Sequence, residues 1–453
     1  MRVWASVLAS VLACVVAVEL PVSSQRTQLY AAEPTRPYSR VKTHKAAKPL
    51  SKQATTHAWT GFLGPTRDGV STETHLLKNW PKGGPSRVWE LEAGDGYASP
   101  AIRHPYLVYP HRVGNEVLVE CLDAETGQQF WQHKFVTAYR DQLGYSSGPR
   151  ATPVIDGDRV YIYSAEGFLI CLDLSSGRLV WKRDLASDFG VPQGFFGTVG
   201  TPLLVGDRLV VNIGKVGGPS VAAFDTRTGK QLWGAGKQWG SGYASPRLVT
   251  LHGKKRVLVF AGGESRPPTG GLMLIDPATG KLELEFPWRS RKYESVNASC
   301  PLMVGGNRIF VSASYQTGTV LLEIGKNLDS HKVVWKMVDA ERNTEANQLG
   351  LHWGTPLVRG GYLYGFDGRN ESDASLVCVD LKAGRVLWRE APEWEQTVTV
   401  QGIEQTLTLS TLRGSFLGAD GQAVILGELG QLMWMDLSPK GYKITQRASL
   451  FLA

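Results

Sequence analysis

Residues able to bind a ligand recur at one place in this sequence, a few positions before a Ser-Pro or Thr-Pro pair. Most are aromatic, and one arginine, one asparagine and one histidine accompany them: Tyr97, Tyr145, Arg150, Phe196, Trp239, Tyr243, Asn297, His352 and Trp353. Such side chains around a concave surface could bind a flat ligand or a peptide. We favour the other interpretation, in which the rings mainly pack against one another.

Three of these positions allow a more specific hypothesis. His352 could act as a general base, although a lone histidine with no visible partner is more often structural. Arg150 could pair with a carboxylate ligand, or it could hold Asp141 or a neighbouring part of the chain. We expect Trp239 and Trp353 to be exposed, and a third, weaker hypothesis is that they form a surface that binds polysaccharide. We assign no catalytic residue and favour a protein without enzymatic activity.

The cysteines and histidines do not predict a metal centre. No His/Cys set has the spacing of a zinc site, and no Cys-x-x-Cys-His haem attachment is present. Cys121, Cys171 and Cys378 each lie two residues before a recurring aspartate. Equivalent positions of different repeats are too far apart for a disulfide, so we predict small buried apolar residues. Cys300 has no obvious partner.

The recurring aspartate belongs to the unit Asp-x-x-(Thr/Ser/Ala)-Gly-x-x-x-Trp. Its copies are Asp123, Gly127 and Trp131; Asp173, Gly177 and Trp181; Asp225, Gly229 and Trp233; Asp276 and Gly280, with Leu284 at the tryptophan position; and Asp380, Gly384 and Trp388. A further copy keeps Trp335 but has Asn327 and His331 in place of aspartate and glycine. We interpret the aspartates as turn residues rather than calcium ligands. The repeat length of about 50 residues is typical of a propeller blade.

The segments between these units predict strands. Each Ser/Thr-Pro pair begins two short apolar runs around a Gly-centred turn, which indicates a hairpin. Each unit then supplies three strands, the Asp…Gly turn, and an outer strand whose tryptophan fills the wedge between neighbouring sheets. The fold class is therefore an all-β propeller of four-stranded blades, in which the aromatic loops ring one mouth of the central channel.

The number of blades is left open between two plans. We find seven three-strand sets, the last starting near Ser415, and eight outer strands, from Trp89 to a final one near 442–450. The sequence ends at Ala453, where an eighth set would begin. Either the propeller has seven blades and a spare strand, or it has eight positions with an incomplete eighth blade. We favour the second plan.

The repeat resembles that of the PQQ-like (quinoprotein) propellers, over about residues 80–445. That family includes PQQ-dependent alcohol dehydrogenases and BamB, the non-catalytic lipoprotein of the outer-membrane assembly complex. The segment from Trp59 to Val70 is similar to one that precedes the propeller in uncharacterised bacterial members, so we predict a cap over 59–80. The domains expected are thus a signal peptide (1–20), a flexible basic linker (21–58) and the propeller with its cap (59–453).

The resemblance implies two functions. The first is a binding or scaffold propeller, whose envelope protein or small ligand docks at the mouth. The alternative is an oxidoreductase for an alcohol or sugar that uses PQQ and calcium. The best-known quinoprotein dehydrogenases carry two adjacent cysteines beside the quinone, which this sequence lacks. Asn297, Asp95 and Asp141 could support a cation, but not in a spacing that we recognise.

Charge and the N-terminus indicate export. The formal net charge is +8. Residues 1–58 carry eight Lys/Arg and two Glu, which is +6, so the remainder is close to neutral at +2. We therefore expect no nucleic-acid partner. The apolar run after Arg2 predicts a secretory signal. Cys14 offers a lipoprotein alternative, and an uncleaved anchor is the third; both would tether the protein to a membrane.

Overall fold

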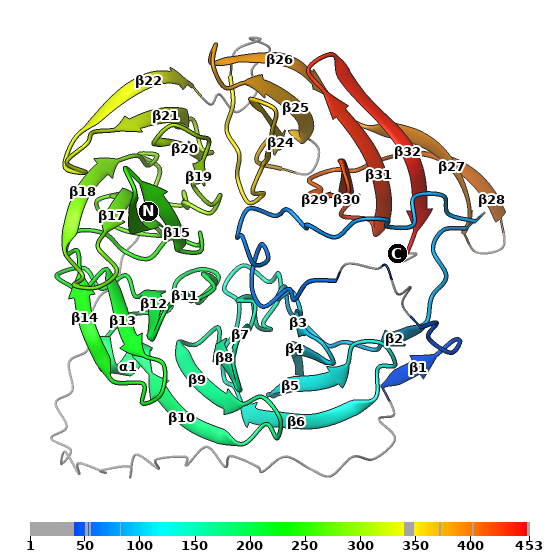
Figure 1. Ribbon diagram of the computed structural model, residues 1–453, viewed down its shortest axis with the longest axis horizontal. Helices are drawn as coiled ribbons and strands as arrows, with labels where there is room; N and C mark the ends of the chain where they lie inside the picture. The colour runs from blue at the N-terminus through cyan, green and yellow to red at the C-terminus, as the bar shows by residue number, and fades with distance from the viewer. Residues whose placement is uncertain are drawn as a thin grey trace, which may run out of the picture.

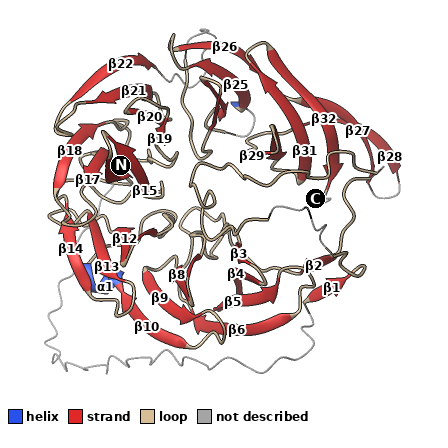
Figure 2. Cartoon of the chain, in the orientation of Figure 1, coloured by secondary structure: helices blue, strands red, loops and turns tan. Residues whose placement is uncertain are grey.

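The computed structural model is a ring of small antiparallel sheets around a central axis (Figures 1 and 2). It describes residues 40–49, 53, 56–81, 83–338, 348–370, 373–400 and 403–450. Within these ranges, seven sheets have four strands each, and in every one the strands follow the chain order from the axis outward. The predicted β-propeller of four-stranded blades is confirmed.

We number the blades 1 to 7 along the chain. The strands of blades 1 to 4 are β3 (Ala101–Arg103), β4 (Tyr106–Val113), β5 (Glu116–Asp123) and β6 (Gln129–Val136); β7 (Val154–Asp156), β8 (Arg159–Tyr163), β9 (Phe168–Asp173) and β10 (Leu179–Asp184); β11 (Leu203–Val205), β12 (Arg208–Asn212), β13 (Val221–Asp225) and β14 (Gln231–Ala235); and β15 (Arg247–Leu251), β16 (Lys254–Ala261), β17 (Gly271–Ile275) and β18 (Leu282–Pro287).

The strands of blades 5 to 7 are β19 (Leu302–Met303), β20 (Arg308–Ala313), β21 (Gly318–Ile324) and β22 (His331–Met337); β23 (Leu357–Arg359), β24 (Tyr362–Asp367), β25 (Ser375–Asp380) and β26 (Arg385–Glu390); and β29 (Ser415–Ala419), β30 (Gln422–Leu426), β31 (Gln431–Ser438) and β32 (Gly441–Ser449). The last set starts at Ser415, and the last outer strand covers the 442–450 region, as the sequence predicted.

The hydrophobic core lies between the blades rather than inside any one of them. Six clusters of buried residues each join two consecutive blades, from blades 1 and 2 to blades 6 and 7. A single four-stranded sheet cannot bury both of its faces, so each blade depends on its neighbours. Cys121, Cys171 and Cys378 are fully buried in these clusters as free thiols, which confirms the prediction made for them.

The repeat unit explains how neighbouring blades are fastened together. The carboxylate of Asp123 accepts backbone N–H bonds from Glu125 and Thr126, which forms the turn before the outer strand. The indole N–H of Trp131 crosses to the next blade and donates to the Leu174 carbonyl at 2.7 Å. The same bond recurs from the other repeat tryptophans: Trp89, Trp181, Trp233, Trp335 and Trp388.

The repeat departs from its pattern in two neighbouring blades at once. Among blades 1 to 6, which carry the unit, blade 4 has Leu284 at the tryptophan position, and blade 5 has His331 at the glycine position. In the intact pairs, the glycine makes room for the tryptophan ring of the preceding blade. Leu284 offers no ring to accommodate, and His331 instead packs edge-on against Phe286 of blade 4, with centroids 4.9 Å apart. The two exceptions therefore belong to one interface.

An eighth position in the ring lies between blades 7 and 1. It holds β2 (Trp89–Leu91), whose tryptophan is bonded to blade 1 in the same way as the other outer strands, and β1 (Val41–Thr43), which pairs with β2. Leu77 and Lys78 cover the face of blade 7 on this side: the Trp434 indole donates to the Leu77 carbonyl, and Lys78 pairs with Asp420 at 3.1 Å. Among the described residues this eighth position holds two strands, so the plan of eight positions is the one observed.

Three features differ from the sequence analysis or add to it. β1 lies inside the range 21–58 assigned to a flexible linker, because pairing with β2 satisfies its backbone; residues 1–39 lie outside the described residues. An external hairpin of β27 (Glu393–Val400) and β28 (Ile403–Ser410) was not predicted. The short helix α1 (Leu185–Phe189) follows β10. In the ranges described, no helix is long and apolar enough to cross a membrane.

Candidate functional site

Residues 59–70 run across the centre of the ring (Figure 1), and we call them the plug. The plug makes backbone hydrogen bonds to the inner strands of three blades: Trp59 with Ile102 in β3, Thr60 with Ile155 in β7, and Gly69 with Gly418 in β29. Ser71, just after the plug, also bonds to Gly418. The Arg67 side chain donates to the Leu204 carbonyl in β11 at 3.4 Å. The channel is therefore filled by the protein's own chain over these inner strands.

The loops that precede the inner strands bring the predicted aromatic residues together. Phe196 lies at the centre of this group. Its ring centroid is 5.3 Å from those of Tyr243 and Trp353 and 5.9 Å from that of Tyr145. Tyr243 and Trp353 also contact each other at 5.9 Å. Edge-to-face and tilted pairs at these distances are favourable, so loops of four different blades form one aromatic cluster.

A buried ion pair supports the cluster from one side. The guanidinium of Arg150 lies 2.6 Å from the Asp141 carboxylate, and both side chains are at most 8% exposed. Asp141 also accepts backbone bonds from Leu143 and Tyr145, each at 3.0 Å. Arg150 lies over the rings of Tyr97 and Phe196, at 4.9 and 5.3 Å from their centroids. Of the two roles considered for Arg150, the structure shows the internal pairing with Asp141.

A second polar contact fixes the opposite side, and the sequence did not indicate it. The Tyr243 hydroxyl donates to Glu264, whose carboxylate also accepts the Phe195 backbone N–H at 2.9 Å. The same hydroxyl accepts the Phe196 N–H at 3.3 Å. Burial, followed by the Glu264 charge, holds the pKa of Tyr243 well above its ordinary value, so it remains a donor.

Part of this assembly faces solvent. Tyr145 is 66% exposed, Tyr97 59% and Leu143 54%, although all three lie on loops held by the Arg150–Asp141 pair. Tyr293 is 36% exposed and extends the group through Phe195, at 5.8 Å, while Arg266 lies over its ring at 4.3 Å. We call Tyr97, Leu143, Tyr145 and Tyr293 the aromatic rim. It is an exposed apolar surface on a rigid base, which protein interfaces favour.

The other predicted residues are internal. Asn297 is 1% exposed, and its amide donates to the Ala261 and Trp288 carbonyls, so it orders the backbone. Trp239 is 4% exposed in the core between blades 3 and 4, and Trp353 packs inside the aromatic cluster. The hypothesis of a polysaccharide surface is wrong for Trp239, whose indole lies in the core, while Trp353 is only partly buried and packs against the rings of the cluster.

His352 is also unsuited to act as a base at the mouth. It is 6% exposed between Tyr315 and Trp353, and its Nδ1 lies 3.3 Å from the Arg369 carbonyl. Burial, with the charges of Arg413 and Arg369, lowers its pKa to about 3, although the bond to the carbonyl acts the other way. The imidazole is therefore neutral at physiological pH and belongs to the packing of the cluster.

A flat quinone with a calcium ion does not fit the described residues at this mouth. The rings of Phe196, Tyr243 and Trp353 contact one another and leave no slot for a further ring between them. The candidate cation ligands Asn297 and Asp141 are engaged in internal bonds. In the ranges described, no group of three or more His, Cys, Asp or Glu side chains could hold a metal ion. We therefore derive no reaction through such a cofactor.

Comparison with known proteins agrees with the repeat. A family model described as outer membrane protein assembly factor BamB matches residues 115–390, which is more than half of the chain. Proteins of that description from Burkholderia pseudomallei and Moranella endobia are 25% and 23% identical, covering 72% and 55% of this chain. The matches span 74% and 60% of those two relatives. A solved europium-containing methanol dehydrogenase superposes with a TM-score of 0.60 at 11% identity, covering 87% of this chain and 85% of its own.

Proposed function

Because this chain belongs to the family described as outer membrane protein assembly factor BamB, we propose that it is an exported, non-catalytic propeller that binds a protein partner in the cell envelope. The observation that carries the proposal is the aromatic rim above its buried base. Tyrosine and leucine side chains that are exposed but held in place lose little conformational entropy when a partner covers them.

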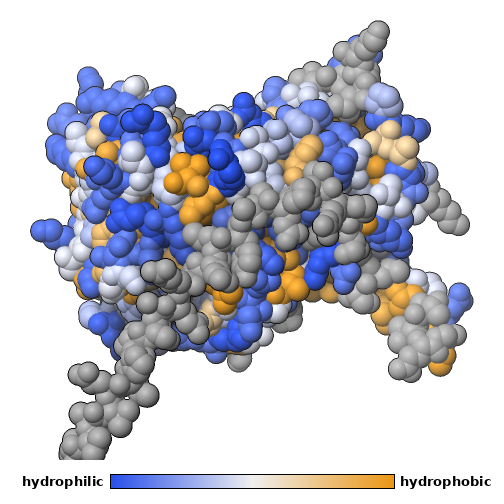
Figure 3. All heavy atoms as spheres, turned by 90° about the horizontal axis from the view of Figure 1, so that it is seen from below, coloured by the Kyte–Doolittle hydropathy of each residue, from blue (hydrophilic) through white to orange (hydrophobic). Residues whose placement is uncertain are grey.

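The outer strands of the blades are less suited to docking. The side of the propeller that Figure 3 shows has polar and apolar residues interspersed. The exposed apolar residues Val180, Leu232 and Val333 lie on the outer strands of three different blades. Single apolar residues of this kind are ordinary on a protein surface. The aromatic rim instead joins loops of several blades, so one partner can contact them together.

The partner is a protein that takes part in outer-membrane protein assembly, as the description of the family and of its members suggests. Export is supported by the apolar run after Arg2. The residues that precede β1 then act as a tether between the processed or lipidated N-terminus, at Cys14 in the lipidated case, and the propeller. This arrangement would hold the aromatic rim near a membrane-bound partner.

Site-specific photo-crosslinking in the native envelope tests the proposal. A photoreactive residue at Tyr145 is expected to give one defined adduct with an envelope protein. The matched control is Leu232, which is 45% exposed on the outer strand of blade 3. An adduct at both positions, or at neither, would contradict docking on the aromatic rim.

A second measurement addresses the cofactor alternative. The exported protein is titrated calorimetrically with PQQ and calcium. We expect no saturable heat, because the aromatic cluster is closed by its own ring contacts. Saturable, calcium-dependent binding would overturn the non-catalytic proposal and call for an assay of alcohol and sugar oxidation with an artificial electron acceptor.

A further inference from the structure

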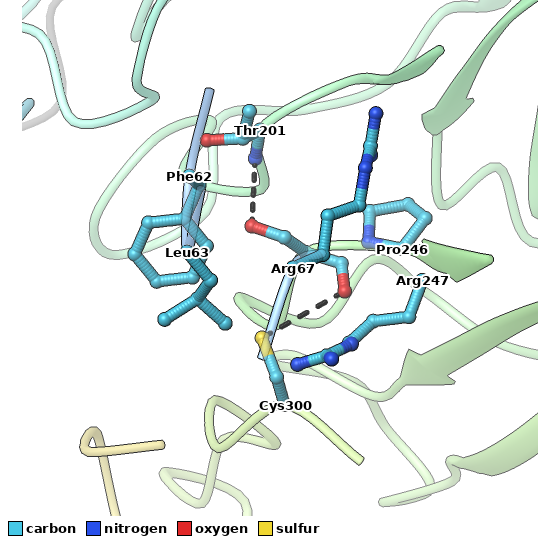
Figure 4. Close-up of a pocket in the computed structure, with 8 residues that line it drawn as sticks. Phe62, Leu63, Arg67, Thr201, Pro246, Arg247 and Cys300 are labelled. Carbon is cyan, nitrogen blue, oxygen red and sulfur yellow. Dashed lines mark hydrogen bonds between the residues drawn. The ribbon is translucent and has the colours of Figure 1, made fainter. Parts of the chain in front are cut away.

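Inside the ring, the plug packs closely against blades 3, 4 and 5. Phe62, Leu63 and Arg67 of the plug line a small cavity together with residues at the inner strands of these blades (Figure 4). The volume of this cavity is about 10 Å³, which admits no more than one water molecule. Contact with a further macromolecule therefore depends on the outside of the propeller.

The external hairpin of β27 and β28 presents a free strand edge on that outside. The hairpin lies at the rim of the ring beyond β32 (Figure 1). Its base is anchored: Arg447 of β32 lies over the Trp394 ring at 4.6 Å, and the Gln396 amide donates to the Ser449 hydroxyl at 3.3 Å. Beyond that base, residues 403–408 are all exposed. Among the described residues, no third strand pairs with the hairpin.

The outer strands of the seven blades also have a free edge, but these edges are protected. Each outer strand pairs with its inner neighbour through a register shift of the kind that a β-bulge produces. All of these strands except β14 also carry a lysine, an arginine or a proline. Bulges, basic side chains and proline are the features by which proteins keep a free edge from pairing with another chain.

β28 has none of these protections. It pairs with β27 along its whole length without a register shift. Its sequence, Ile403–Ser410, contains one charged residue, Glu404, and no lysine, arginine or proline. Ile403 is 62% exposed and Leu407 40% exposed. A regular, nearly uncharged edge of this kind is a template on which another strand can pair.

The geometry of the hairpin decides which backbone groups are free. In a hairpin with a two-residue loop, the pair next to the loop, here Val400 and Ile403, is a hydrogen-bonded pair. Residues then alternate along the strand between facing the partner strand and facing away from it. Glu404, Thr406 and Thr408 therefore direct their N–H and C=O groups away from β27. Among the described residues, these groups bond to no other part of the chain.

We propose that β28 pairs antiparallel with β28 of a second copy of this chain, about a two-fold axis at Thr406. In this register Thr406 lies opposite its own counterpart, Glu404 lies opposite Thr408, and Ile403 lies opposite Leu409. The whole exposed strand is then paired, and no carboxylate lies directly opposite another, so the strand is complementary to itself. Because side chains alternate between faces, the apolar side chains of both copies fall on one face of the joint sheet.

This contact is closed, since each copy uses its β28 edge once and the same surface serves on both sides. A single pair of strands is a small interface, so we expect a reversible dimer rather than a permanent one. The contact is separate from the aromatic rim and does not depend on the proposed envelope partner.

Sedimentation equilibrium of the exported protein is the first test. The average mass should rise with concentration from that of one chain toward that of two. Thr406→Pro removes an N–H that is bonded across the axis in both copies but is not used within the hairpin. It should weaken dimerisation about tenfold or more and leave the melting temperature unchanged. The mass of one chain at every concentration, masses that grow beyond two chains, or equal dimerisation of the variant would each overturn the proposal.

The second test distinguishes a second copy in this register from any other use of the edge. In a hydrogen-bonded antiparallel pair the two Cα atoms at position 406 are about 5.5 Å apart, which a disulfide can bridge. Thr406→Cys should therefore form a covalent dimer under mild oxidation. The matched control is Thr408→Cys, an exposed threonine of the same strand that lies opposite Glu404 and should stay monomeric. The native cysteines that the structure describes are buried. Dimers from both variants, or from neither, contradict the two-fold pairing.

Discussion

Gly177 of blade 2 lies against the indole of Trp131 of blade 1. A Cβ atom at Gly177 would be 2.5 Å from the Trp131 ring, and the backbone there has a φ of 67°, in the left-handed region. Glycine is therefore required twice, for its conformation and for the space it leaves. The same relationship joins Gly127 to Trp89, Gly229 to Trp181, Gly280 to Trp233 and Gly384 to Trp335.

Gly177→Ala should accordingly be more damaging than a glycine substitution in an ordinary turn. Gly157, in the hairpin between β7 and β8, has a φ of 53° and no atom within 4 Å of an added Cβ. Gly157→Ala should lower the free energy of unfolding by about 1–2 kcal/mol, because alanine is strained in the left-handed backbone conformation but meets no other atom. Gly177→Ala should lose about 1–3 kcal/mol more through overpacking. Urea unfolding measures both; equal losses would contradict the packing role of Gly177.

The contact joins two blades, but the motif that supplies its residues is local within each unit, which explains why the fold could be predicted from the sequence. The Asp turn, the glycine and the tryptophan of each unit lie within nine residues, so the pattern is visible without the structure. The hairpin of β27 and β28 was missed, although residues 393–400 and 403–410 flank Gln401-Gly402 and Thr alternates with apolar residues along part of them. That signal is periodic in the way a strand requires, but it has no counterpart in the repeat.

The candidate site was only partly predictable. Phe196, Tyr243 and Trp353 were grouped because each precedes a Ser/Thr-Pro pair. The structure brings their rings together, because the loops before the inner strands converge on the axis. Trp239 has the same kind of sequence context, but its indole turns into the core. The role of Glu264 could not be predicted from the sequence. Glu264 and its partners Tyr243 and Phe195 lie on three different loops, which only the folded chain brings together. Whether an aromatic residue is exposed depends on such tertiary contacts, which the repeat pattern does not encode.

Tyr145→Ser tests the aromatic rim without disturbing the fold. Tyr145 is 66% exposed and touches only Phe196 among the rings of the cluster. Its replacement should leave the melting temperature within about 1 °C, since exposed substitutions rarely change stability by more than ~0.5 kcal/mol. Affinity for the crosslinked partner should fall about tenfold or more. Binding measured with the purified partner decides this; unchanged affinity would remove Tyr145 from the interface.

Asp141 and Arg150 should behave as one unit beneath the aromatic rim. Asp141→Asn leaves the buried Arg150 charge unpaired, and Arg150→Met does the same to Asp141. Each single change should reduce the free energy of unfolding by about 3 kcal/mol. The double variant should lose clearly less than the sum, because both charges are then gone. Additive losses in thermal unfolding would show that the two side chains are not coupled.

His352 should make stability depend on pH. Its pKa is about 3 in the folded protein, below the usual 6.5 expected in the unfolded chain. Between these values the unfolded state binds a proton that the folded state does not, so stability falls as the pH drops below 6.5. The slope is about 1.4 kcal/mol per pH unit.

Comparison with His352→Gln isolates this contribution, since every other group titrates in both proteins. From pH 7.5 to pH 5.0, the wild type should lose about 2 kcal/mol of unfolding free energy relative to the variant. A difference that stays constant across this range would show that His352 titrates in the folded protein with the same pKa as in the unfolded chain, and would contradict the lowered value.

The most direct test of the proposed function is the amount of folded outer-membrane protein in cells that carry variants of this chain. Tyr97→Ser combined with Tyr145→Ser should lower that amount as far as deletion of the whole chain does, while Leu232→Ser should leave it unchanged. Full activity of the double variant, in cells where deletion lowers the amount, would contradict docking on the aromatic rim. No effect of the deletion itself would contradict the role in assembly.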